Sequence, residues 1–303
     1  MRVLIINEHT ADDRKTLAAM GSLAGHGFKV SVASDSRRSE PLASDDCHEK
    51  HICPSPVSDL PAFLEWLNAH CMHGGPDVVL PMSDYSVHAI VRSDSTSAWR
   101  QCCPVPTAES LNTAHDKLRT IELATGLGIA APHTWCPGNQ DDVSRIAGEI
   151  EFPCVLKLRK GAGGEGLSFP ETPGQLIEAY DGIDCGRDTV FSNRRPLIQE
   201  CIPGTVHDAC LLMNRGKTRA AFTQKRLEMH PPAGGVGIHN ESTDNPELLS
   251  QAEVLLKALH WHGPAMVEFR RDERDGQYKL MEINARFWGT LELAIRAGVD
   301  FPW

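Results

Sequence analysis

A short segment near the C-terminal end places three chemically useful side chains on one face of a predicted strand. Along the run 281–286 (MEINAR), side chains of an extended chain alternate between faces with a period of two. Glu282, Asn284 and Arg286 therefore share one face. Met281, Ile283 and Ala285 are expected to face the other, apolar side. Because Mg²⁺ takes oxygen ligands and arginine holds phosphate or carboxylate oxygens, the polar face suits a magnesium–nucleotide site. An amphipathic edge strand with a solvated polar face would show the same pattern.

A second carboxylate, Glu268, lies upstream in another short apolar strand, 265–269. A polar loop with an Asp-Gly turn signal at 275–276 joins the two strands. A strict two-residue turn there would set Glu268 opposite Ile283, on the wrong face. Glu268 joins Glu282 and Asn284 only if the loop has an odd length or the strand pair carries a bulge. The register of this hairpin therefore decides whether the three residues form a metal site.

A glycine-rich loop, 160–166, follows the β-rich apolar run 154–158, which contains Lys157. Glycines let the backbone approach a ligand closely, and their N–H groups can form an anion-binding concavity. A second apolar run, 167–169, follows the loop. No Lys-Ser/Thr pair closes the loop and no helix opens after it, so it is neither a P-loop nor a dinucleotide fingerprint. We interpret it as a flap over phosphates, although a flexible hairpin would look the same.

The order of these segments resembles the ATP-grasp superfamily, and most of all its carbamoyl-phosphate-synthase-like carboxylate–amine ligases. A strand that ends at a Pro-Gly break, 196–204, lies where such proteins have the hinge of a clamp. Ala285 departs from the pattern, because many relatives carry proline between the asparagine and the arginine. The resemblance covers nearly the whole chain. In order, the matching segments are Asp116-Lys117 at a helix start, Lys157, 161–166, 199–202, Lys225-Arg226, Glu268 and 282–286.

The resemblance implies a role for each candidate residue. The residues expected to hold or cover the ATP phosphates are Lys117, Lys157 (also near the adenine), Gly161, Gly163, Gly164 and Gly166. The residues expected to contact the adenine edge are Gln199, Glu200, Cys201 and Ile202, with Asp208 at the ribose. One or two Mg²⁺ ions, with Mn²⁺ as a substitute, would bind Glu268, Glu282 and Asn284. Arg226 and Arg286 would stabilise the transferring phosphoryl group or the substrate carboxylate.

The implied activity is that of an ATP-dependent, ADP-forming ligase joining a small-molecule carboxylate to an amine or a thiol. An amine cannot displace oxide from a carboxylate, whereas an acylphosphate made with ATP has a good leaving group. Phosphoryl transfer depends mainly on positioning and charge stabilisation, and a closing flap would keep water from the acylphosphate. Two alternatives remain open. One is an enzyme whose end product is an acylphosphate or carboxyphosphate, and the other is a non-catalytic ATP-binding regulatory module.

The predicted fold combines α/β and α+β parts. Residues 1–105 read as a Rossmann-like domain, because strands at 2–6, 28–33 and 77–81 alternate with helices. Residues 106–303 would form an ATP-grasp clamp of two α+β subdomains, with a lid at about 133–198.

Polar residues follow two of the predicted strands. Functional groups of parallel sheets lie at the carboxyl ends of strands, so Asn7, Glu8, Ser83 and Asp84 either face substrate or act as loop polars and helix caps. The helix that follows the Pro104–Pro106 linker would be capped by Asn112 or Thr113.

Composition excludes several classes of partner. The chain has 303 residues, a formal net charge of −10 and 41% hydrophobic residues. Excess acid argues against nucleic acid, and no apolar run reaches membrane-spanning length, so we expect a cytoplasmic enzyme without a membrane partner. The ten cysteines show no paired C-x-x-C spacing and are interpreted as reduced thiols. A homodimer is the assembly to test, and the apolar ending 301–303 indicates a sequence that is cut short.

Overall fold

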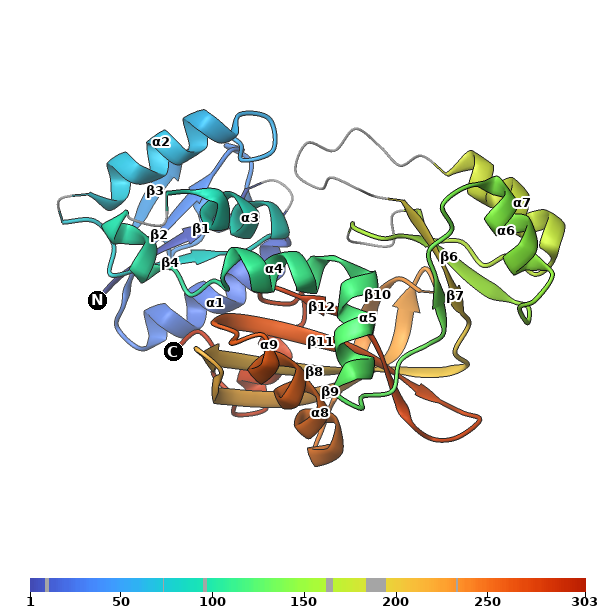
Figure 1. Ribbon diagram of the computed structural model, residues 1–303. Helices are drawn as coiled ribbons and strands as arrows, with labels where there is room; N and C mark the ends of the chain where they lie inside the picture. Colours follow the sequence, from blue (N-terminus) through green and yellow to red (C-terminus); the bar gives the residue numbers. More distant parts are fainter. Residues whose placement is uncertain (9–10, 73, 95–96, 162–165, 184–194, 233) are drawn as a thin grey trace.

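Three sheets organise the molecule (Figure 1). The computed structural model describes residues 1–303 apart from 9–10, 73, 95–96, 162–165, 184–194 and 233. A parallel sheet in the N-terminal part is followed by two antiparallel sheets, one carried by the middle of the chain and one by its C-terminal part. The fold class predicted from the sequence is therefore confirmed.

The N-terminal sheet has the strand order β3-β2-β1-β4. Its strands are β1 (Arg2–Ile6), β2 (Lys29–Ser34), β3 (Glu49–Ile52) and β4 (Val78–Pro81). Its helices are α1 (Asp13–Gly25), α2 (Leu60–Cys71) and α3 (Asp84–Arg92), with 3₁₀ turns at Glu40–Ala43 and Ala98–Cys102. Strand β3 was not predicted, because it lies at the edge of the sheet and its EKHI sequence has no apolar alternation. The other three strands match their predicted positions to within a few residues.

Helix starts in this part of the chain follow ordinary capping chemistry. The Asp12 carboxylate accepts a hydrogen bond from the Arg14 N–H at the start of α1, and Ser83 forms a capping box at the start of α3. The prediction that Asn112 or Thr113 caps the next helix is wrong. Both lie inside α4 (Ala108–His115), which Thr107 caps, and the separate helix α5 (Lys117–Gly126) opens after its own cap, Asp116.

The middle of the chain forms a small α+β unit on the right of Figure 1. Its sheet has the order β5-β7-β6, with β5 (Thr134–Trp135), β6 (Cys154–Leu158) and β7 (Pro196–Glu200). Helices α6 (Gln140–Ala147) and α7 (Pro173–Gly182) pack on it. After β6 the chain turns back, since Leu156 and Ser168 exchange two backbone hydrogen bonds of 2.9 Å. This antiparallel bridge supports the predicted hairpin around the glycine loop, whose tip lies outside the described residues.

The third sheet is antiparallel, with the order β10-β9-β8-β11-β12. Its strands are β8 (Gly204–Asn214), β9 (Lys217–His230), β10 (Val236–Thr243), β11 (Gly263–Asp272) and β12 (Tyr278–Asn284), with helices α8 (Pro246–Ala258) and α9 (Leu291–Arg296). Helices α4 and α5 pack on β12 (Figure 1).

Two apolar cores join the N-terminal sheet to this third sheet, whereas the middle unit has a core of its own. Strand β1 shows why, because Leu4 and Ile6 enter one core while Val3 and Ile5 enter the other. Within the described ranges, no helix is long and apolar enough to cross a membrane.

Candidate functional site

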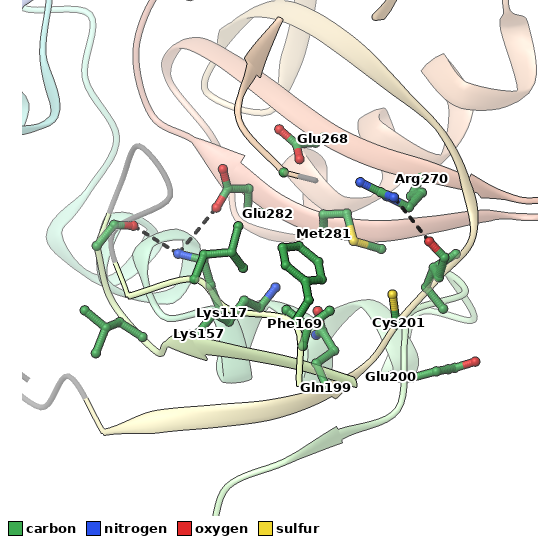
Figure 2. Close-up of a pocket in the computed structure, with 16 residues that line it drawn as sticks. Lys117, Lys157, Phe169, Gln199, Glu200, Cys201, Glu268, Arg270, Met281 and Glu282 are labelled. Carbon is green, nitrogen blue, oxygen red and sulfur yellow. Dashed lines mark hydrogen bonds and ion pairs between the residues drawn. The ribbon is translucent and has the colours of Figure 1, made fainter. Parts of the chain in front are cut away.

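The first of two neighbouring cavities lies between the middle unit and the third sheet (Figure 2). Phe169 and Met281 project into the space between Gln199 on β7 and the acids of β11 and β12. An apolar slot with lysines at one end suits a flat base that carries a polyphosphate. The lining residues are Lys117, Val155, Lys157, Leu158, Gly161, Leu167, Phe169, Gln199, Glu200, Cys201, Ile202, Gly234, Glu268, Arg270, Met281 and Glu282.

The second cavity, of about 410 Å³, lies beside the first and shares Gly234, Glu268 and Glu282 with it. Its walls come from the segments after β1 and β4, from the five strands β8 to β12, and from the segment after β12. Besides the shared residues, it is lined by Asp12, Arg14, Lys15, Ser83, Asp84, Tyr85, Asp208, Gln224, Arg226, Gly235, Val236, Gly237, Asn240, Met266, Asn284, Arg286, Trp288, Gly289 and Thr290. The two acids therefore form the wall at which both cavities meet.

A bulge sets the register of the acids. Glu268 pairs with Glu282, but the next residue, Phe269, pairs with Leu280, so Met281 is the extra residue on β12. The bulge predicted as one way to bring the acids together is therefore present. The predicted apolar orientation of Met281 is wrong, because the bulge turns its side chain into the first cavity next to Glu282, while Leu280 and Ile283 enter the core.

Two lysines face the acid pair from the first cavity. Lys117 Nζ lies 3.4 Å from Glu282 Oε2 and donates a 3.0 Å hydrogen bond to the Gly161 carbonyl. Burial, together with the nearby Lys117, lowers the pKa of Lys157 to about 8, although Glu282 and Glu268 oppose this shift. Burial acts to raise the pKa of Glu282, but Lys117 and Lys157 hold it below its usual value. These cations would lie along a bound polyphosphate.

The shared wall also offers oxygen atoms for a divalent cation. Glu268, Glu282 and Asn284 carry two carboxylates and an amide, and Asn284 Nδ2 donates to Glu282 Oε1 at 3.3 Å. Burial raises the pKa of Glu268, and the neighbouring Glu282 and Asp208 add to the shift, although Arg226 opposes it. Hard cations such as Mg²⁺ take this kind of oxygen donor. Within the described ranges, no cluster of three or more His, Cys, Asp or Glu residues could hold a metal, so the amide would be the third ligand.

Arg226 is fixed by two carboxylates from neighbouring strands. Its Nε and Nη2 donate to Asp208 Oδ2 and Oδ1 at 3.1 and 2.7 Å, and Nη2 also donates to Glu268. Asp208 has no exposed surface and accepts a further hydrogen bond from Gln224. The ribose contact expected of Asp208 does not fit this position, because both carboxylate oxygens are engaged and the residue lines the second cavity. Asp208 instead orients Arg226.

Arg286 is held from the N-terminal part of the chain. Its Nε donates a 2.7 Å hydrogen bond to Asp84 Oδ2, and Nη1 donates to the Phe287 carbonyl at 3.1 Å. His115 Nε2 lies 3.4 Å from the other Asp84 oxygen. Burial acts to raise the pKa of Asp84, but Arg286 and His115 hold it well below its usual value. Asp84 therefore remains an anion that fixes Arg286 at the cavity wall.

Of the remaining predicted residues, Gly161, Gln199, Cys201 and Ile202 line the first cavity. Glu200 lines the first cavity, but Arg274 and the His133 N–H bind its carboxylate, so its side chain fixes the hinge and is not free for the adenine contact expected of it. Gly166 has φ of +66° and packs against Leu158, where a Cβ would lie 2.7 Å from Cγ. Gly163 and Gly164 lie outside the described residues.

Of the polar residues expected at the strand ends, Ser83 and Asp84 line the second cavity. Asn7 instead binds Asp13 and Ser39 and belongs to the packing around α1. Glu8 is buried and does not line either cavity.

Several cavity residues were not predicted. Lys15 and Trp288 line the second cavity, and Phe169 and Arg270 line the first. A charged residue in the first turn of the helix that follows the first strand of a parallel sheet is a signal that could have indicated Lys15.

Comparisons with known proteins give a family match and several related enzymes. A family described as ATP-grasp in the biosynthetic pathway with Ter operon matches residues 197–303. A putative urea carboxylase of Emericella nidulans is 26% identical over 212 residues, which are 64% of this chain and 17% of that protein. A probable alpha-L-glutamate ligase of Thioalkalivibrio sulfidiphilus is 31% identical over 131 residues, 41% of this chain and 40% of that protein. The match thus spans less than half the length of each curated relative.

Solved structures share the fold over almost the whole chain. The biotin carboxylase of Campylobacter jejuni, solved with an ATP analogue, superposes with a TM-score of 0.79 and 17% identity, covering 99% of this chain and 69% of that one. An L-amino acid ligase of Bacillus licheniformis gives a TM-score of 0.73 and 15% identity, covering 99% and 72%. Residues 197–303 thus match an ATP-grasp family, and the chain as a whole shares the fold of these solved enzymes.

Proposed function

We propose that the protein is an ATP-dependent, ADP-forming ligase that joins a carboxylate to an amine through an acylphosphate. The observation that carries the proposal is the shared wall, where Glu268 and Glu282 border both cavities. ATP in the first cavity would direct its γ-phosphate toward this wall, and a carboxylate in the second would approach from the other side. Lys117 and Lys157, which are expected to bind the nucleotide phosphates, thus line the first cavity. Arg226 and Arg286, which are expected to assist phosphoryl transfer, line the second cavity on the other side of the acid pair.

The residues of this chain divide the work. Lys117 and Lys157 neutralise the phosphates, and Glu282, Glu268 and Asn284 would hold Mg²⁺, which supplies Lewis-acid stabilisation of the transferring group when bound. Arg226 and Arg286 face the acceptor side, where charge develops during transfer. The carboxylate oxygen attacks the γ-phosphorus and ADP leaves. The amine then attacks the acyl carbon and phosphate leaves, while one proton of the amine is released.

A second reaction has its own support, because the matched relatives include carboxylases. Bicarbonate would then replace the organic carboxylate, and carboxyphosphate would form. The second cavity is large for that ion alone, since its roughly 410 Å³ lies within the usual range for organic ligands of about 300–1,000 Å³. The family description, which names a biosynthetic pathway, is also consistent with a condensing enzyme.

Hydroxylamine can stand in for the unknown amine in a first screen. The full chain with MgATP and hydroxylamine would be incubated with a panel of small carboxylates, and ADP and hydroxamate would be measured together. We expect both products only with particular organic carboxylates, and an amide once the true amine is supplied. ADP release with bicarbonate alone would favour the carboxyphosphate reaction. Tight ATP binding without turnover on any acid would indicate the regulatory module, and a thioester with added thiols would place the chain among carboxylate–thiol ligases.

A further inference from the structure

The N-terminal sheet reverses its strand order next to the second cavity. The chain builds outward from β1 through β2 to β3 and then returns to the opposite side of β1 as β4. Ligands of such sheets bind at the carboxyl ends of strands where the order reverses. Asp12, Arg14 and Lys15 follow β1, and Ser83 and Asp84 follow β4, and all of them line the second cavity.

Lys15 is a buried cation that lines this cavity. Its relative exposure is 3%, and within the described ranges its ammonium group has neither a hydrogen bond nor an ion pair. Burial, together with the nearby Arg286, lowers the pKa of Lys15 to about 7, although Asp84, Asp12 and Glu8 oppose the shift. Burying an unpaired ammonium group costs free energy, and an anion that binds to it lowers that cost.

Two of the three acids near Lys15, Asp12 and Asp84, are already engaged by other cations. Arg14 donates to Asp12 from Nε and Nη2 at 3.1 and 2.8 Å. Asp84 is bound by Arg286 and lies against His115. Glu8 is buried outside the cavity lining. The ammonium of Lys15 is therefore available to a group that enters the cavity.

A second donor without a partner lines the same cavity. The Trp288 indole N–H is buried and has no hydrogen-bond acceptor within the described ranges, and Trp288 lines the second cavity together with Lys15. Buried donors are normally satisfied, so two unsatisfied donors that line one cavity indicate a missing acceptor.

We propose that Lys15 and Trp288 form an anion subsite that binds a carboxylate or phosphate group distinct from the carboxylate that is phosphorylated. Neither residue lines the first cavity, whereas the reacting carboxylate has to reach the shared wall at Glu268 and Glu282. The subsite itself stands on the geometry of the cavity. What the subsite implies for the substrates rests on the proposed function. At least one substrate would carry an acidic group in addition to the reacting carboxylate, as in a dicarboxylate, an amino acid or a phosphorylated amine.

The binding test uses two simple anions and the full chain. With a non-hydrolysable ATP analogue and Mg²⁺ saturating the nucleotide cavity, inorganic phosphate and malonate are titrated separately by calorimetry. Lys15→Met should weaken binding of the preferred anion by about 10-fold to 100-fold, the usual loss for one charge-assisted hydrogen bond, and Trp288→Phe by a smaller factor. Lys257→Met, on an exposed face of α8, is the matched control and should bind as wild type does.

Two results would overturn the subsite. One is wild-type protein that binds neither anion, and the other is Lys15→Met protein that binds both as tightly as wild type. Thermal unfolding of each variant checks that the fold is retained. In turnover, Lys15→Met should raise KM for the acidic substrate while kcat and KM for ATP stay nearly constant. Failure of the proposed function is distinguishable, because ADP release would then be absent with every acid while the anion titration still decides the subsite.

Discussion

Replacement of Arg286 by lysine keeps the positive charge at this position but removes the planar guanidinium group that fixes its direction. Arg286 donates from Nε to Asp84 at 2.7 Å and from Nη1 to the Phe287 carbonyl at 3.1 Å, and its Nη2 lies 3.5 Å from Asn284 Oδ1. A lysine has one nitrogen at the end of a flexible stem. It can keep the ion pair with Asp84 but cannot also present a planar fork toward the second cavity.

The expected size of the effect follows from these contacts. Loss of one preorganised donor in the transition state typically removes about 3 kcal/mol, which corresponds to roughly 10²-fold in kcat. Stability should fall by only about 1 kcal/mol, because Asp84 keeps a cationic partner and one hydrogen bond to a carbonyl is lost. ATP affinity should hardly change, since Arg286 does not line the nucleotide cavity.

Calorimetry with an ATP analogue, ADP release and urea unfolding together test this prediction. Arg296→Lys is the matched control, because Arg296 lies exposed on α9 and pairs with Glu292 one turn away. The control should match wild type in all three assays. The reasoning is refuted if Arg286→Lys turns over at the wild-type rate, and equally if its main defect is in ATP binding.

Three further outcomes are expected. Glu282→Gln should lower ADP release by about 10²-fold with little change in thermal unfolding, and a chelator should abolish wild-type activity until Mg²⁺ is restored; activity that survives chelation would contradict the metal assignment. Asp208→Asn should lower kcat through Arg226 and leave ATP affinity near wild type, whereas a ribose contact would show as weaker ATP binding by calorimetry. Lys15→Met should stabilise the protein most below pH 7, because a buried lysine with a pKa of about 7 stays charged there at a cost, and the gain should shrink toward pH 10.5 as the unfolded chain also loses its proton. Urea unfolding at low and high pH tests the last of these, and a gain that grows with pH would contradict it.

Many of the residues that line the first cavity could be predicted, because the segments that carry them have local sequence patterns. A lysine before a glycine loop, a strand ending at Pro203-Gly204 and the alternation around Glu282 are each visible within about ten residues. The orientation of Met281 could not be predicted in this way. A bulge arises from the pairing of β11 with β12, and strand alternation read along β12 alone gives the wrong face for the one extra residue.

The acceptor side could not be predicted from local patterns, because its residues come from segments far apart in the sequence. Lys15, Asp84 and Trp288 meet only after the N-terminal sheet has packed on the third sheet through two shared cores. The close packing of these segments is seen at Gly289, where a Cβ would lie 2.8 Å from the Asp12 carboxylate. The sequence predicted Asp84 at the end of a strand but left open whether it faces substrate or is a loop polar or helix cap.

In the structure Asp84 lines the second cavity and holds Arg286 in place, and a similar arrangement occurs at Arg226. Arg286 donates one hydrogen bond of 2.7 Å to Asp84. Arg226 donates two hydrogen bonds, of 3.1 and 2.7 Å, to the carboxylate of Asp208. A buried arginine without such a partner would either turn toward the nearest acid of the metal site or disturb the fold. Placing a carboxylate behind each arginine keeps the guanidinium charged and immobile while its remaining N–H groups face the cavity. The acids of this chain therefore have two separable tasks, because Asp84 and Asp208 hold cations in place while Glu268 and Glu282 border the space where phosphate would be transferred.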